Sequence, residues 1–128
     1  MLENTFLSLW SLLEILTGTD KGDILIRRIL YGIKQNHREA CQWELRHLHI
    51  YRNRYVHQGK TRPDIERLVY QLKMYVDVML RCWLFQFGKL EDEQVLFSLL
   101  DTPLDSQGIA KRMRILKHAL ENARKAGR

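Results

Sequence analysis

Cysteine and proline are scarce in this chain, with two residues of each among 128. The two cysteines, Cys41 and Cys82, are too few for a disulfide-stabilised scaffold, so a reducing cytoplasmic location is expected. Long apolar runs are also missing, since even Phe6–Leu16 is interrupted by two serines and Glu14. That segment is too short for a membrane span and lacks the basic start of a secretion signal. We therefore expect no membrane partner.

The composition is that of a folded domain. Hydrophobic residues make up 45% and charged residues 28%, with only seven glycines. These fractions exclude a disordered, collagen-like or low-complexity chain. A length of 128 residues is enough for one domain with a packed core.

The net charge of +6 is unevenly distributed. The segment Lys111–Arg128 has seven basic residues and one acidic residue, which leaves 14 basic and 14 acidic residues in the rest of the chain. Only this last segment therefore has the charge expected of a nucleic-acid-binding surface. Its apolar residues also recur at helical spacing, which predicts that it docks on the bundle or on a partner, or is simply a solvated helix face.

Apolar residues recur at helical spacing through most of the chain, and the breaks fall at glycine and proline. We expect helices over about Glu3–Thr17, Asp23–Gln35, Glu39–Gln58, the stretch from Thr61 to Phe87, Glu91–Leu100 and from Gly108 onward. Gly18 suits a left-handed helix end, Thr61 an N-cap, and Pro63 a first helical turn. The expected fold is all-α, a bundle of about four core helices plus two shorter C-terminal helices. Residues 1–100 form the bundle, and residues 101–128 form a basic helix that is part of the domain or an appendage.

The apolar stripes of these helices predict the core. Its expected members are Phe6, Leu9, Trp10, Leu13, Leu16, Ile24, Ile26, Leu30, Ile33, Cys41, Leu45, Leu48, Tyr55, Val56, Ile65, Leu68, Val69, Leu72, Val76, Met79, Leu80, Trp83 and Phe87.

The third predicted helix has an arginine, Arg52, in the middle of its apolar arc. A guanidinium group keeps its charge, so a buried arginine has to be paired or has to face a cavity or an interface. Glu14, the only acidic residue of the first helix after Glu3, is the partner that we expect. A structural ion pair and a functional role for Arg52 are compatible.

A polar stripe runs beside this apolar arc. It contains Arg46, His49, Asn53 and His57, of which the last three are spaced at i, i+4 and i+8. Arg52 and His57 are separated by about 140° around a regular helix. They can meet at one small group only if the helix deforms or if two chains combine about a twofold axis.

Histidine and arginine together suit one kind of chemistry. An imidazole transfers protons near neutral pH, and a guanidinium stabilises the developing charge on a phosphate. Such a set suits metal-independent cleavage of RNA, in which the ribose 2'-hydroxyl is the nucleophile. We expect no cofactor and no metal, because no second cysteine or carboxylate cluster completes a site around His37 and Cys41.

The segment Arg52–His57, RNRYVH, resembles the Arg-polar-x-x-x-His motif of HEPN domains, in particular the Apea-like group. The segment Leu7–Leu16, LSLWSLLEIL, resembles the first helix of that group. The resemblance spans about Thr5–Phe87. It implies a helical bundle, a homodimer and an RNA endonuclease of a toxin–antitoxin or antiphage system, with an antitoxin or a larger defence protein as a further partner.

Residue by residue, the resemblance makes Arg52 the phosphate-binding residue, His57 the acid/base residue and Asn53 a polar adjunct. Glu14 corresponds to the acidic residue of the first helix, and His49 and Arg46 are supporting residues. The dimer implied by the resemblance has the helix of Arg52 and His57 near its twofold axis. Further candidates for binding RNA are Arg54, Lys60, Lys111, Arg112 and Arg114.

Less specific interpretations remain open. His57 lies near the C-terminus of its helix, where a histidine favours the helix dipole without any chemical role. The surface around Arg52 and His57 could bind a nucleotide or RNA without cleaving it, or could only mediate dimerisation. The chain could also be an adaptor or antitoxin subunit.

Overall fold

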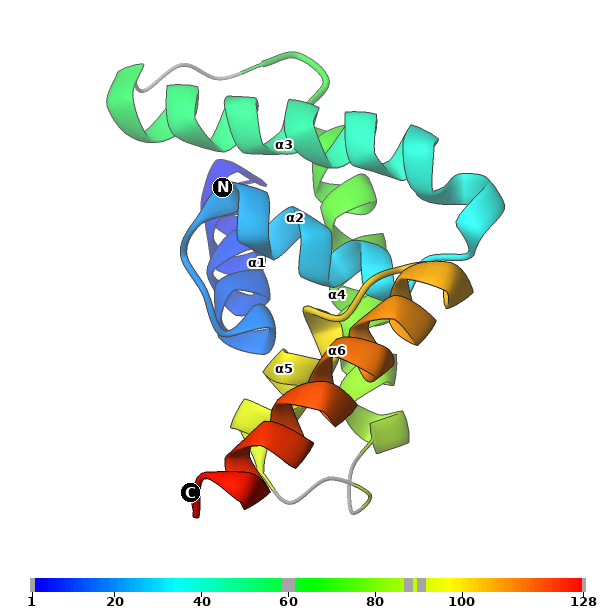
Figure 1. The fold of residues 1–128 in the computed structure, drawn as a ribbon. Helices are drawn as coiled ribbons and strands as arrows, with labels where there is room; N and C mark the ends of the chain where they lie inside the picture. The colour runs from blue at the N-terminus through cyan, green and yellow to red at the C-terminus, as the bar shows by residue number, and fades with distance from the viewer. Residues whose placement is uncertain (1, 59–61, 87–88, 90–91, 128) are drawn as a thin grey trace.

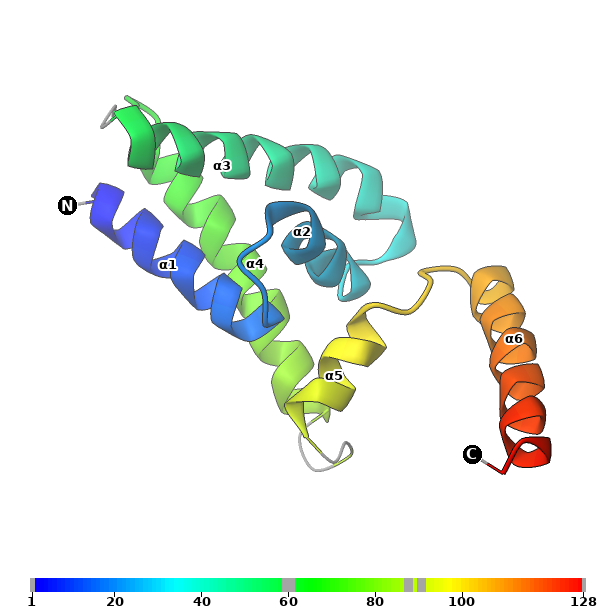
Figure 2. The ribbon, with the colours of Figure 1, turned by 60° about the vertical axis from the view of Figure 1, so that its left-hand side comes forward.

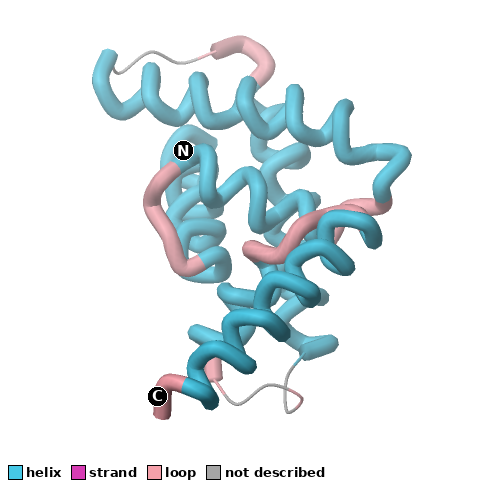
Figure 3. Tube along the Cα trace, in the orientation of Figure 1, coloured by secondary structure: helices cyan, strands magenta, loops and turns pink. Residues whose placement is uncertain are grey.

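The computed structural model describes residues 2–58, 62–86, 89 and 92–127, without the side chains of residues 56–58. These described residues contain helices and no strands (Figure 3). The elements are α1 (Leu2–Thr17), α2 (Gly22–Tyr31), a 3-10 turn η1 (Gln35–His37), α3 (Arg38–Gln58), α4 (Ile65–Gln86), α5 (Glu93–Leu100) and α6 (Ser106–Lys125). The expected all-α bundle is thus confirmed.

The helix ends follow local chemistry. Gly18 ends α1 with a φ of 71°, as expected for a left-handed glycine cap. The second helix ends at Tyr31, earlier than predicted, because Gly32 caps it. The backbone N–H of Gly32 donates to the oxygen of Ile29, and that of Ile33 donates to the oxygen of Leu30. The expected N-cap Thr61 and the expected helix end at Phe87 lie outside the described residues.

The core forms where α1 packs side by side with α4 (Figure 2), the most extensive contact between helices in the described residues. Its buried hydrophobic residues are Phe6, Trp10, Leu13, Leu16, Leu25, Ile26, Ile29, Leu30, Leu45, Leu48, Tyr51, Ile65, Leu68, Leu72, Tyr75, Val76, Met79, Leu96, Phe97 and Leu100. The predicted core position Leu80 is wrong, because this side chain is turned to the outer face of α4. Tyr75, by contrast, is fully buried and donates a hydrogen bond to Glu44 Oε1 at 2.7 Å.

The third helix lies across one end of the α1–α4 pair (Figure 1). Two ring contacts fix its direction relative to α1. Phe6 packs edge-on against Tyr51 at 4.8 Å between ring centroids, and Trp10 stacks on His49 at 5.5 Å. Along this contact, therefore, residues later in α1 meet residues earlier in α3.

The turn that follows α5 is tied back to the bundle by Arg28. Its Nε and Nη2 atoms each donate to a carboxylate oxygen of Asp101 at 2.8 Å, and its Nη1 donates to the backbone oxygen of Thr17 at 2.6 Å. Arg38 joins the same region, donating to the backbone oxygen of Leu104 at 3.0 Å. These two arginines link α2 and α3 to the segment that leads into α6.

Hydrogen bonding to Arg28 lowers the pKa of Asp101 below its ordinary value of 3.8, with a further lowering by Arg27. The stabilising effect is therefore fully present at neutral pH and is lost as the pH falls below about 4. We expect Asp101→Asn to lower the free energy of unfolding at pH 7 by about 1 kcal/mol or less, because the pair is partly exposed. Urea denaturation at pH 7 and in acid should show this difference shrinking as the pH falls. An equal difference at both pH values would contradict this assignment.

The last helix stands apart from the bundle (Figure 2). No residue of α6 is buried, and its apolar residues Ile109, Met113, Leu116 and Leu120 are all exposed. The expectation that this stripe docks on the bundle is therefore wrong for this chain taken alone.

Within the described ranges, no helix combines the length and the apolar character that crossing a membrane requires.

Candidate functional site

The candidate site lies on α3, around Arg52. This helix is α-helical throughout Arg38–Gln58. Positions 52 and 57 therefore stay about 140° apart around its axis. The helix is not deformed between these positions, so only a pairing of two chains is left to bring them together. The side chain of His57 lies outside the described residues.

Arg52 is a half-buried arginine without a carboxylate partner among the described residues. Its Nη1 atom donates to Asn53 Oδ1 at 3.3 Å, and its Nε atom is buried without a hydrogen bond within the described part of the chain. A buried cation is normally neutralised by a nearby anion. The site therefore has a positive charge that no described carboxylate neutralises, and this charge favours an anionic ligand.

The expected ion pair between Arg52 and Glu14 is not formed. No hydrogen bond or ion pair joins these side chains in the described ranges. The cause is the direction of the helices, because Trp10 already lies beside His49. Glu14, one turn later in α1, is carried toward earlier residues of α3 and away from Arg52.

Asn53 connects Arg52 to His49. While its Oδ1 accepts from Arg52, its Nδ2 lies 3.4 Å from His49 Nε2. An amide nitrogen only donates, so His49 Nε2 is the acceptor and its proton resides on Nδ1 when the ring is neutral. The i, i+4 spacing of His49 and Asn53 thus places them in contact, as the polar stripe predicted.

The His49 ring is held from two sides. Its face stacks on Trp10 with an angle of 9° between the ring planes, and Trp10 itself is almost completely buried. On another side the ring approaches Gly22 so closely that a Cβ atom there would collide with it. The imidazole can therefore lie here only because residue 22 has no side chain.

The electrostatics of the site favour neutral His49. Burial lowers its pKa below the ordinary value of 6.5, the charge of Arg52 lowers it further, and Asp23 opposes both. At neutral pH the ring is therefore uncharged and able to accept from Asn53. His49 positions the amide that contacts Arg52.

This electrostatic coupling leads to a prediction. Arg52→Gln should raise the pKa of His49, because it removes the positive charge that disfavours the imidazolium. Asp23→Asn should lower the same pKa, because it removes the opposing negative charge. Titration of the His49 ring resonances by NMR measures both shifts. A pKa of His49 that is unchanged in both variants would show that the ring does not sense these neighbours.

The other predicted residues lie elsewhere. Arg46 is exposed, with its guanidinium 5.6 Å from the centre of the Trp43 ring, and Arg54 is exposed on α3. Lys60 lies outside the described residues. The three basic candidates of α6, Lys111, Arg112 and Arg114, are all exposed on a helix far from the Arg52 end of α3 (Figures 1 and 2). The structure thus brings together Arg52, Asn53 and His49.

Two residues of the site were not predicted for it. Trp10 was expected only in the core, and Gly22 was not singled out. Glycine is common near the start of a helix, so its presence at position 22, just after the N-cap Lys21, was not a signal. The reason for glycine there, the space needed by His49, depends on a contact between α2 and α3 that no local pattern contains.

Among the described residues, no group of three or more His, Cys, Asp or Glu side chains is placed to hold a metal ion. Comparison with protein-family models, with curated proteins and with solved structures found no match.

Proposed function

We propose that this chain is a metal-independent RNA endonuclease of the HEPN type, with its site on α3. The observation that carries the proposal is the unneutralised, half-buried guanidinium of Arg52, whose Nε atom has no partner in the described part of the chain. A phosphodiester supplies the missing negative charge and accepts several hydrogen bonds from one guanidinium. The resemblance of Arg52–His57 to the HEPN motif adds the acid/base residue, His57.

In the proposed reaction, the ribose 2'-oxygen attacks the adjacent phosphorus and the 5'-oxygen of the next nucleotide leaves. A histidine takes the proton of the 2'-hydroxyl, and a second protonated histidine gives a proton to the leaving oxygen. Arg52 binds the phosphate and stabilises the charge that develops in the transition state. The products are a 2',3'-cyclic phosphate and a 5'-hydroxyl, and no metal ion is needed.

The regular geometry of α3 supports a site built from two chains. Because positions 52 and 57 do not face one another on a straight helix, Arg52 of one copy and His57 of another are the pair that converges. Two copies also supply the two histidines that the reaction uses.

The outer face of α3, on the side of the helix opposite Arg52, is a candidate surface for pairing with another chain. Trp43 and Ile50 are seven residues apart, so they lie on one side of the helix, and their exposed fractions are 65% and 51%. Exposed apolar side chains at this spacing are typical of helix pairing. Arg54, one turn after Ile50, adds an exposed positive charge to the same face.

The ribonuclease assay tests the proposal with labelled single-stranded RNA in excess EDTA. We expect wild-type protein to cut the RNA and to leave 2',3'-cyclic phosphate ends, whereas His57→Ala does not cut. The matched control is His118→Ala, which removes an exposed histidine of α6. RNA that is bound but never cut would overturn the proposal and favour a non-catalytic binding module. Equal cutting by wild type and His57→Ala would indicate a contaminating nuclease.

A further inference from the structure

The outer face of α4 carries exposed apolar side chains along most of the helix. Tyr70, Met74, Leu84 and Phe85 have exposed fractions from 45% to 75%. They lie within one arc of about 100° around the helix axis, together with exposed Asp77 and Arg81. A contiguous exposed apolar surface of this kind marks an interaction site.

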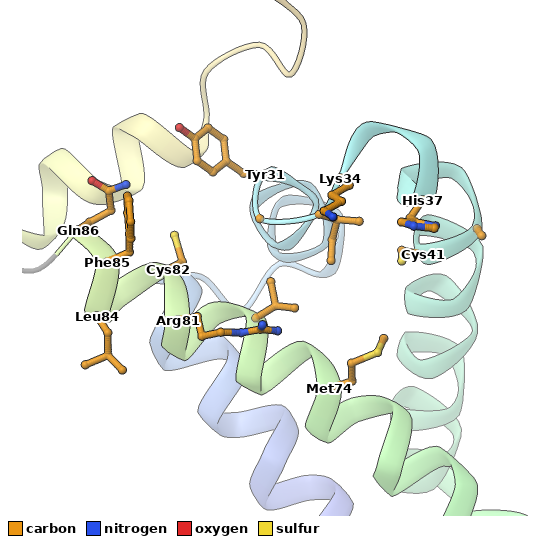
Figure 4. A pocket seen from close by; sticks show the side chains of 14 residues that line it. Tyr31, Lys34, His37, Cys41, Met74, Arg81, Cys82, Leu84, Phe85 and Gln86 are labelled. Carbon is orange, nitrogen blue, oxygen red and sulfur yellow. The ribbon is translucent and has the colours of Figure 1, made fainter.

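A cleft of about 1000 Å³ opens beside this face, between α4 and the elements η1, α2 and α3 (Figure 4). Most of its lining is apolar, and Met74, Val78 and Ile33 contribute to it. Its charged groups are the basic side chains of Lys34 and Arg81, and none of the described lining residues is acidic. The cleft therefore accepts an apolar side chain and disfavours a basic segment.

The chain's own unattached helix does not fit this cleft. The apolar stripe of α6 is flanked by Lys111, Arg112, Arg114 and Lys117, so docking would bring basic groups against Lys34 and Arg81. Juxtaposed like charges in an interface are strongly unfavourable. We therefore expect that α6 does not occupy this cleft.

The α4 face is complementary to itself. In an antiparallel pair of α4 helices about a twofold axis level with position 79, residues pair when their numbers add up to 158. Asp77 of one copy then lies opposite Arg81 of the other, and the exposed apolar residues Leu84 and Met74 lie at the same level of the pair. A twofold axis repeats each of these pairings.

Both charges are available for such a pairing. Arg81 Nε donates to the backbone oxygen of Asp77 at 3.4 Å, and no ion pair joins the two side chains within the described chain. Both residues are exposed. Each pairing therefore joins two charges that form no ion pair within the described part of the single chain.

We propose that the outer face of α4, the surface formed by Tyr70, Met74, Asp77, Arg81, Leu84 and Phe85, binds a second copy of this chain in antiparallel orientation. In this pair Asp77 pairs with Arg81 across the interface, and the exposed apolar side chains of the two faces pack against one another. This surface lies on a different helix from the pairing proposed for α3, so the inference goes beyond the proposed function.

Complementary charge reversals test this contact. All proteins carry Ile50→Glu, which removes any pairing through α3, and their masses are measured by sedimentation. We expect this parent to form dimers of twice the 15.3 kDa chain mass. Asp77→Arg alone and Arg81→Asp alone each place like charges opposite one another twice, so each should weaken dimerisation about a hundredfold. Mixing the two variants restores opposite charges at both pairings and should restore a dimer.

The matched control is Glu121→Arg, a charge reversal at an exposed position of α6, which should dimerise like the parent. Circular dichroism of each variant checks that it is folded. A monomeric parent, single variants that dimerise normally, or a mixture that stays monomeric would each overturn the proposal. Because cleavage is not measured here, failure of this contact and failure of the proposed ribonuclease activity are separate results.

Discussion

Arg52→Ala is expected to lower the rate of RNA cleavage by a factor of at least about 100, the usual effect of removing one preorganised donor to a developing negative charge. Arg52 is the one half-buried cation of the site, and no carboxylate neutralises it in the described part of the chain. The loss should appear in kcat as well as in kcat/KM, because the guanidinium interacts most strongly with the transition state.

Two further variants sharpen this prediction. Arg52→Lys keeps the charge but loses the planar group that contacts two oxygens, so it should recover only part of the activity. Arg67→Ala removes an exposed arginine of α4 that pairs with Asp64, and it should leave cleavage unchanged. If Arg52→Ala cleaved like wild type, Arg52 would have a structural role and the proposed site would be wrong.

Trp10→Ala should have the largest effect on stability. Trp10 is 3% exposed and lies in the core between α1 and α3. Truncating a buried aromatic residue to alanine leaves a cavity and costs about 3–5 kcal/mol. The variant should also release His49, whose ring then gains solvent, so the pKa of His49 should rise toward its ordinary value.

Urea denaturation and NMR titration measure these two effects. Ile15→Ala is the matched control, because Ile15 is exposed on the same helix and its truncation should change the free energy of unfolding by less than about 0.5 kcal/mol. A Trp10→Ala protein as stable as the Ile15→Ala protein would contradict the position of Trp10 in the core.

The helices were largely predictable because their signals are local. Glycine at position 18 and apolar spacing in α1 and α4 depend on residues close together in the chain. The buried face of α2 was less predictable. Ile24, Leu25 and Ile26 are consecutive, so the apolar pattern does not show which side of the helix is buried. The structure buries Leu25 and Ile29, which were not expected, and leaves Ile24 only partly buried. Packing against α1, α3 and α5 decides this orientation, and such tertiary contacts do not appear in the local pattern.

The site was predictable to the same extent. The contact of His49 with Asn53 follows from their spacing on one helix, and the unusual position of Arg52 was visible on a helical wheel. The expected partner Glu14 was wrong because the relative direction of α1 and α3 is not encoded in either helix alone. Gly22 was missed for the same reason, because its importance depends on how closely α2 approaches His49.

Cleavage of a modified RNA tests the central claim most directly. Two oligonucleotides of one sequence are compared in EDTA, one with ribose throughout and one with 2'-O-methyl ribose throughout. If the 2'-hydroxyl is the nucleophile, the protein should cut the first and leave the second intact. Equal cutting of both, or no cutting of the ribose strand, would contradict the proposed reaction on α3.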